Sequence, residues 1–116
     1  MIKATITRDA GLIVGFRLEG HSGYAEKGRD IVCAAASAVA QTAVLGLEHT
    51  PGISVEKSIR EAFLECRVLS AQPGEARVRH DAITQTMLKG LLSLEAGHKD
   101  YIKIEICDIE EVSTCS

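Results

Sequence analysis

A long segment without charged side chains, residues 31–47, follows Asp30 and ends before Pro51-Gly52. It is rich in Ala, the best helix former, and Asp30 is a favourable N-cap. The pattern therefore predicts a helix over residues 30–50, about 20 residues or ~30 Å long. Apolar residues cover nearly its whole circumference, so we expect the helix to be largely buried. The small alanines allow a sheet or a second helix to approach it closely.

Alternating apolar and polar residues predict strands on both sides of this helix. The expected strands are residues 2–9, 12–19, 53–59, 62–70 and 101–109. Ala10-Gly11 favours a hairpin between the first two, and Gly15 suggests a bulge or a close backbone approach. Helical spacing of apolar residues predicts a second helix over residues 75–95. The order β-β-α-β-β-α-β indicates an α/β (α+β) two-layer sandwich, a mixed β-sheet with two helices on one face.

The overall composition is that of a globular protein. The 116 residues fit a single domain, 1–116, and 46% are hydrophobic. The net charge of −3 argues against direct nucleic-acid binding. Because we expect neither a membrane span nor a signal peptide, we predict a cytoplasmic protein that does not bind membranes.

The cysteines are spaced unlike the ligands of a metal site. They stand at positions 33, 66, 107 and 115, without a C-x-x-C pair. Structural zinc sites usually show such pairs, so we expect no metal, and without an export signal a disulfide framework is also unexpected. No phosphate-binding or dinucleotide-binding motif occurs, so we expect no cofactor. Four independent thiols are therefore predicted.

One segment combines the features of a Cys–His site. A loop over residues 20–29 is predicted from its glycines, and it joins His21 to the start of the helix at Asp30. Cys33 would then lie near the positive helix end, which favours the thiolate and offers free N–H groups to an oxyanion. The loop can fold His21 back onto Cys33, so that imidazole takes the thiol proton and later protonates the leaving amine.

Each of these residues also has a purely structural interpretation. Cys33 can pack as a small hydrophobe, and His21 can be an ordinary surface or capping residue. Asp30 can cap the helix, orient His21, or do both. Ser37, one turn after Cys33, can bond the thiol or the imidazole, or its own backbone. The glycine-rich loop can be a lid over a substrate or a plain surface loop.

Together the two motifs resemble those of a known family. The runs are Gly-His-Ser-Gly-Tyr-Ala at residues 20–25 and Gly-Arg-Asp-Ile-Val-Cys-Ala-Ala-Ala-Ser at residues 28–37. They are similar to the signature of the ribosomal-processing cysteine protease family, Prp. Length, element order and the closing strand are similar too, so the resemblance covers nearly the whole chain.

The resemblance implies a bacterial, cytoplasmic cysteine endopeptidase. Its substrate would be the short N-terminal extension of large-subunit ribosomal protein number twenty-seven, whose removal ribosome maturation requires. Cys33 would be the nucleophile and His21 the general base and acid, while Asp30 and Ser37 match further motif positions. The family is homodimeric, and a flexible loop between His and Cys, here residues 22–29, orders on substrate. The expected substrate-loop residues are Gly20, Ser22, Gly23, Tyr24 and Gly28.

Two other functions remain open from the residues alone. In a non-catalytic ribosome-associated binding module, Cys33 and His21 would merely pack. A thiol-dependent acyl hydrolase of small esters would use the same pair and would need a deep apolar pocket.

Overall fold

The computed structural model describes residues 1–20 and 27–109, with the backbone alone for 27–30. The elements follow the predicted order β-β-α-β-β-α-β. They are β1 (Ile2–Asp9), β2 (Leu12–Glu19), α1 (Lys27–Glu48), β3 (Ile53–Arg60), β4 (Phe63–Ala71), α2 (Glu75–Gly97) and β5 (Ile102–Asp108). The strands differ from the predicted ranges by at most one residue at an end, whereas α1 begins earlier than expected.

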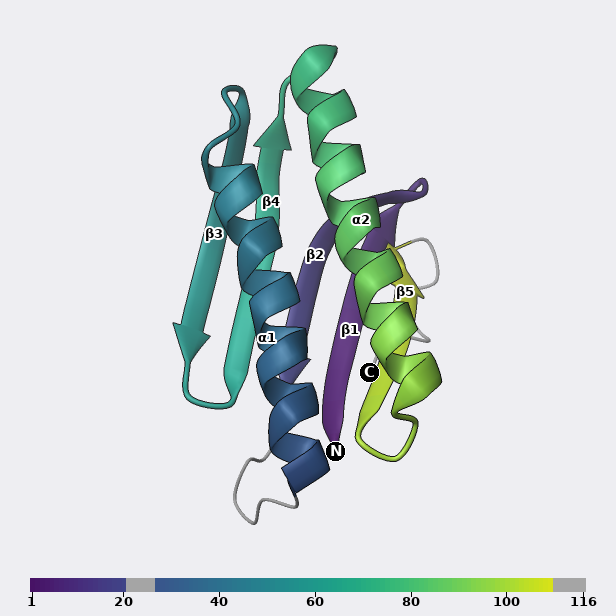
Figure 1. Ribbon diagram of the computed structural model, residues 1–116. Helices are drawn as coiled ribbons and strands as arrows, with labels where there is room; N and C mark the ends of the chain where they lie inside the picture. The colour runs from purple at the N-terminus through teal and green to yellow at the C-terminus, as the bar shows by residue number, and fades with distance from the viewer. Residues whose placement is uncertain (21–26, 110–116) are drawn as a thin grey trace.

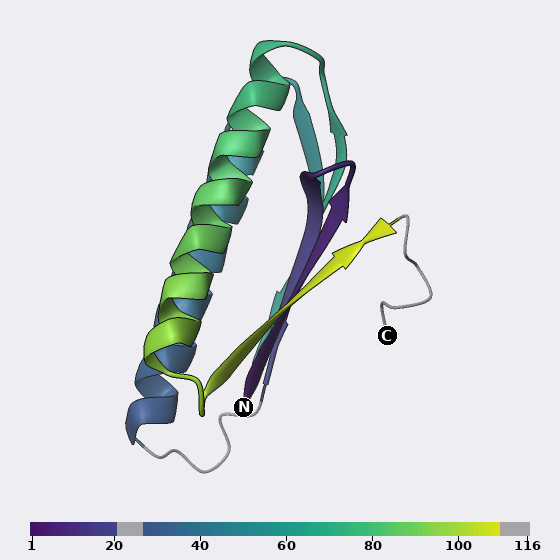
Figure 2. The same ribbon diagram turned by 90° about the vertical axis from the view of Figure 1, so that its right-hand side faces the viewer.

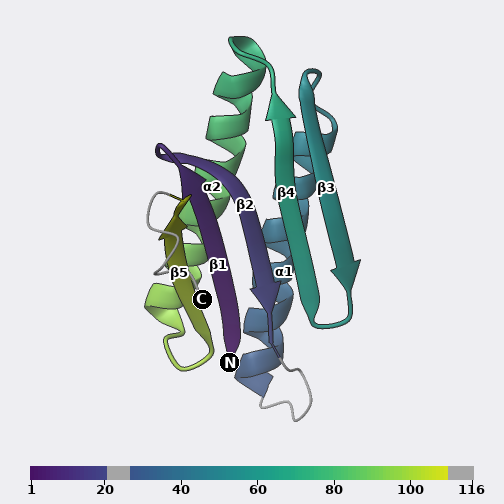
Figure 3. The same cartoon turned by 180° about the vertical axis from the view of Figure 1, so that it is seen from behind.

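The strands form one five-stranded sheet in the order β3-β4-β2-β1-β5 (Figures 1 and 3). β5 runs parallel to β1, and the other neighbours are antiparallel, so the sheet is mixed as predicted. Figure 2 shows both helices on one side of the sheet. The predicted two-layer α+β sandwich is confirmed.

The β1–β2 hairpin carries the irregularity that Gly15 suggested. Its turn uses Ala10 and Gly11, both with positive φ (51° and 84°), as in the tight turns that match strand twist. Thr7 pairs with Gly15 but Arg8 pairs with Ile13, so Val14 is an extra residue. One extra residue in one strand is a β-bulge, and it increases the local twist.

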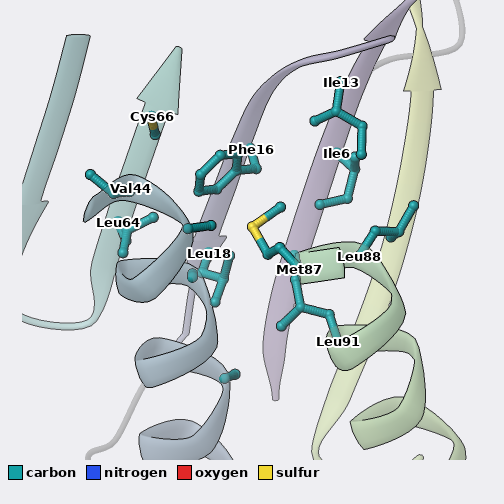
Figure 4. Close-up of a cluster of buried hydrophobic side chains, with 14 of the residues drawn as sticks. Ile6, Ile13, Phe16, Leu18, Val44, Leu64, Cys66, Met87, Leu88 and Leu91 are labelled. Carbon is teal, nitrogen blue, oxygen red and sulfur yellow. The ribbon is translucent and has the colours of Figure 1, made fainter. Parts of the chain in front are cut away.

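The core lies between the two layers, as the period-two pattern of the strands dictates. Alternate residues of β1, Ile2, Ala4 and Ile6, are buried against the helices. Figure 4 shows the same convergence from β2, β4 and both helices; the labelled side chains are Ile6, Ile13, Phe16, Leu18, Val44, Leu64, Cys66, Met87, Leu88 and Leu91.

The prediction that α1 is largely buried is wrong. Over Ile31–Glu48, 33% of the residues are buried, although this stretch is long and apolar enough to pass for a membrane span by composition. A helix in a two-layer fold contacts the sheet along one stripe only, here Val32, Ala36, Ala40 and Val44 among others. Many of its other positions are alanines, whose methyl groups expose little apolar surface. This segment therefore packs one face on the sheet and leaves the other exposed.

Side chains of neighbouring elements bind β5, one of the two outer strands of the sheet. On β5, the backbone N–H of Ile104 donates to Oε2 of Glu95 from α2, at 2.7 Å. Arg8 of β1 also binds Asp108 of β5 through two hydrogen bonds of 2.9 and 3.0 Å. This bidentate pair lowers the pKa of the Asp108 carboxyl. The β5 edge is thus held by side chains from both α2 and β1.

Candidate active site

Cys33 lines a pocket at one end of the sheet. The pocket has a volume of about 110 Å³, and the Cys33 side chain in its wall is half-buried. Its lining comes from the start of β1, the end of β2, residues 33–41 of α1 and the β3–β4 hairpin. The pocket is small, and most of its lining side chains are apolar.

The hairpin wall of the pocket is built by Ile59, Arg60, Ala62 and Phe63. The Arg60 guanidinium lies 4.2 Å from the centroid of the Phe63 ring. A cation–π contact of this kind holds both side chains in place. Arg60 thereby adds a positive charge to a pocket lining that also includes the acidic Glu19. Sequence reasoning missed these residues because the hairpin lies far from Cys33 along the chain.

Gly20 joins the end of β2 to this site by a close backbone approach. A Cβ at this position would lie 2.9 Å from both the Met1 carbonyl oxygen and the Ile2 Cα. The Gly20 N–H also donates to the Ala62 carbonyl at 3.2 Å. The chain is thereby fixed immediately before His21, and only glycine fits.

Gly20→Ala should lower stability by about 1–3 kcal/mol, because the new methyl forces the backbone of β1 away. Gly97→Ala is the matched control, since a Cβ there meets nothing within 4 Å. The measurement is denaturant unfolding of both variants, together with peptide cleavage. Equal unfolding midpoints for Gly20→Ala and wild type would show that no such close contact exists.

Ser37 follows Cys33 on the same side of α1, and it also lines the pocket. Its Oγ accepts a hydrogen bond of 2.9 Å from Nε2 of Gln41. This partner differs from the thiol, imidazole and backbone carbonyl considered from the sequence. Because the Ser37 oxygen is the acceptor in this bond, the Ser37 hydroxyl can still donate its proton to a group bound in the pocket.

The prediction that Asp30 caps the helix is wrong. Helix α1 already includes Lys27, so Asp30 and Gly28 lie within it rather than at its boundary or in a loop. Cys33 is consequently about two turns into the helix. Only the first four N–H groups of a helix lack partners, so they lie one turn or more before Cys33. The predicted oxyanion site at the helix end is therefore displaced from the sulfur.

Four predicted site residues, His21, Ser22, Gly23 and Tyr24, lie outside the described residues. Their roles stay predictions, and so does a contact between Asp30 and His21. The structure brings together Cys33, Ser37 and Gly20 around one pocket. Within residues 1–20 and 31–109, no three His, Cys, Asp or Glu side chains gather as a metal site would require.

The sequence matches the family model of cysteine protease Prp over residues 1–103. It is 32% identical to the ribosomal processing cysteine protease Prp of Bacillus subtilis, over 90% of this chain and 96% of that protein. The chain belongs to the Prp cysteine protease family.

Two solved structures of the S. aureus member of the Prp family share this fold. One holds a substrate peptide; it has a TM-score of 0.77 at 24% identity, covering 91% of this chain and 99% of that one. The other holds a covalently linked product peptide; it has a TM-score of 0.74 at 28% identity, with the same coverage. The family relationship makes this chain a cysteine protease of the ribosomal-processing type. The next question is which of its thiols suits the reaction.

Among the thiols that the structure describes, Cys33 is the one that suits a Prp nucleophile. Cys66 is buried within β4, and burial raises its pKa to about 11, so it stays protonated and shielded. Cys107 is buried within β5. Reactive cysteines lie in partially exposed surroundings, whereas buried structural ones are inert. Cys33 is half-buried and lines a pocket of about 110 Å³.

Proposed function

We propose that this protein is an endopeptidase that uses Cys33 as nucleophile and His21 as general base and acid. The observation that carries the proposal is the half-buried Cys33 in the wall of the pocket at the end of β2. Gly20 belongs to the same pocket and directly precedes His21 in the chain. Gly20 in the pocket wall is therefore followed directly by His21, the histidine that the proposal requires to contact the thiol.

The proposed reaction proceeds in two stages. Cys33 loses its proton to the imidazole of His21, and the sulfur attacks the carbonyl carbon of the scissile peptide bond. The tetrahedral intermediate collapses as the C–N bond breaks, and the leaving amine takes the proton from the imidazolium. Water, deprotonated by the imidazole, then attacks the thioester carbon; this releases the carboxyl product and restores the thiol. The covalently linked product peptide of the S. aureus relative supports such a thioester route.

Ser37 and Asp30 have supporting roles in this proposal. Ser37 lies on the pocket and accepts a hydrogen bond from Gln41, which fixes the position of its hydroxyl. It can then donate to the sulfur or to the oxyanion. Asp30 lies one turn before Cys33 on α1 and would orient His21.

The proposed substrate is the N-terminal extension of large-subunit ribosomal protein number twenty-seven, whose removal ribosome maturation would require. Support comes from the family, named for ribosomal processing, and from the substrate peptide held by the S. aureus relative. A protein with a net charge of −3 also attracts the basic chains of ribosomal proteins. The peptide would contact the residues predicted for substrate binding, Gly20, Ser22, Gly23, Tyr24 and Gly28.

The proposal includes a cytoplasmic homodimer, without a metal, a cofactor or direct contact with nucleic acid. The large apolar side chains Ile31 and Leu45 of α1 are more than half exposed, which is consistent with a surface that a second copy covers. Light scattering coupled to gel filtration measures the mass directly, and a monomer at micromolar concentration would contradict this part.

The test of the function is cleavage of a peptide that spans the N-terminal extension in the same organism, with products identified by mass spectrometry. We expect one cut at a single position, and an unrelated peptide of equal length should stay intact. Tight binding without a cut would replace the protease with a non-catalytic ribosome-associated binding module. Hydrolysis of thioesters but not of this peptide would instead indicate an acyl hydrolase.

A further inference from the structure

We propose that the peptide substrate binds as an additional β-strand along the outer edge of β3, beside the pocket that Cys33 lines. The inference rests on the proposed function and names how the substrate is held. An added strand gains affinity from main-chain hydrogen bonds, while pockets for alternate side chains give selectivity. Three observations on the described residues carry the inference.

The first observation is that β3 has the open edge. The sheet order places β3 and β5 at its two margins (Figure 1). On β5, Glu95 already accepts the hydrogen bond of the Ile104 N–H, so its edge is blocked near the middle. In residues 1–20 and 27–109, no strand pairs with β3 on the side away from β4 (Figure 3). An extended peptide therefore finds unpaired backbone groups on β3.

The second observation is the register of the β3–β4 hairpin. Arg60 pairs with Phe63 across a two-residue turn, and Ile59 pairs with Leu64. In such hairpins the closing pair exchanges hydrogen bonds, and the next pair does not. The N–H and C=O groups of Ile59 therefore point outward, away from β4. By the same alternation the N–H and C=O groups of Lys57 also point outward. Lys57 and Ile59 therefore offer a row of hydrogen-bonding groups along the edge of β3.

The third observation is that this row of partners begins at the pocket. Ile59 and Arg60 line the same pocket as Cys33, so a strand paired with Ile59 passes the pocket at its hairpin end. Side chains of a strand alternate between the faces of a sheet, so every second peptide residue would point to the helix side, where Cys33 lies. Because the pocket extends inward to β2 and β1, the peptide would leave the β3 edge at the hairpin for its scissile bond to enter the pocket.

An ion pair holds the side chain of Lys57, at the end of this row of backbone groups that lies away from the hairpin. Lys57 binds Glu48 of α1 at 2.8 Å, so its side chain is engaged above the sheet rather than extended along the edge. The Ile59 side chain, 45% exposed, lies on the same face of the sheet as Lys57, two residues away. An extended peptide can cover this exposed apolar side chain without displacing the Lys57–Glu48 ion pair.

Ile59→Pro tests the edge directly, because proline removes the outward N–H and is tolerated in an edge strand at such a position. Ile59→Ala is the matched control, since it shortens the same side chain but keeps the N–H. We expect KM for the peptide to rise about 3- to 10-fold in Ile59→Pro relative to Ile59→Ala, the effect of one lost hydrogen bond. kcat should change little. Circular dichroism and denaturant unfolding check that both variants fold.

A second measurement leaves the protein's β3 strand unaltered. Peptides N-methylated at one backbone position at a time are bound to the Cys33→Ala protein, and affinity is measured by fluorescence anisotropy. Strand addition predicts weaker binding at every second position around the cleavage site and little effect between them. Equal KM values for the two Ile59 variants, or methylation effects without this alternation, would overturn the inference. Because the anisotropy measurement needs no cleavage, failure of the protease function is distinguishable from failure of edge binding.

Discussion

Cys33→Ala is expected to abolish peptide cleavage, with a fall in kcat on the order of 10⁴-fold or more. The alanine methyl cannot attack a carbonyl, and no other described thiol reaches the pocket, since Cys66 and Cys107 are buried. The fold should persist, because the half-buried sulfur contributes little to the core. Cys33→Ser should also lose most activity, since its hydroxyl does not ionise under the same conditions. The rate of peptide cleavage, followed by mass spectrometry, is the measurement.

Cys66→Ala is the matched control for this variant. It removes the same atom from strand β4 instead of helix α1, and it should retain cleavage while losing stability on the order of 1 kcal/mol through the cavity left behind. Alkylation of the native protein provides an independent readout. Iodoacetamide should modify Cys33 well before Cys66, whose pKa is raised to about 11 by burial. Cleavage by Cys33→Ala at the wild-type rate would refute the assignment of the nucleophile.

Leu47→Ala is expected to lower the free energy of unfolding by about 2–5 kcal/mol. Leu47 has no exposed surface and belongs to the core cluster that α1 shares with the sheet. Replacing it leaves a cavity that the surrounding side chains fill only in part. Denaturant unfolding followed by circular dichroism gives the difference.

Leu45→Ala is the control for this second variant, because Leu45 lies on the same helix and is 54% exposed. Its substitution should change stability by less than about 0.5 kcal/mol in the monomer. A loss as large as that of Leu47→Ala would mean that the outer face of α1 is covered in solution. Unfolding at two protein concentrations separates this case, since the stability of a dimer depends on concentration.

The strands of this protein follow closely from its sequence. Period-two alternation predicted residues 2–9 and 12–19, which match β1 and β2, because each strand buries one face only. The turn residues Ala10 and Gly11 fixed where the hairpin reverses. Local patterns suffice here because neighbouring residues determine both the turn and the buried face.

The start of α1 could not be predicted in the same way. Glycine is a poor helix former, so Gly28 indicated a loop, yet it lies inside the helix. Tertiary packing of Val32 and Ala36 against the sheet outweighs the weak local preference. This early start moved Cys33 from the first turn of the helix toward the second.

The pocket could be predicted only in part. Cys33 and Ser37 are one turn apart, so their shared side of the helix is a local property. The walls from Ile59 and Phe63 depend on how the β3–β4 hairpin sits beside β2, which no short pattern records. The close approach of Gly20 to Met1 and Ile2 likewise joins the two ends of a hairpin.

The parallel pairing of β1 with β5 has a consequence for how this chain is made. β1 is synthesised before the other strands of the sheet, but one of its two partners is the last strand of the fold, with Ile2 opposite Ile102. Contacts between such distant segments form slowly, because the intervening chain must be ordered before they close. During synthesis β1 can pair with β2 but keeps one side open until Ile102–Asp108 has emerged. The sheet is therefore complete only once β5 has docked, and until then the free edge of β1 is open to pairing with a strand of another chain.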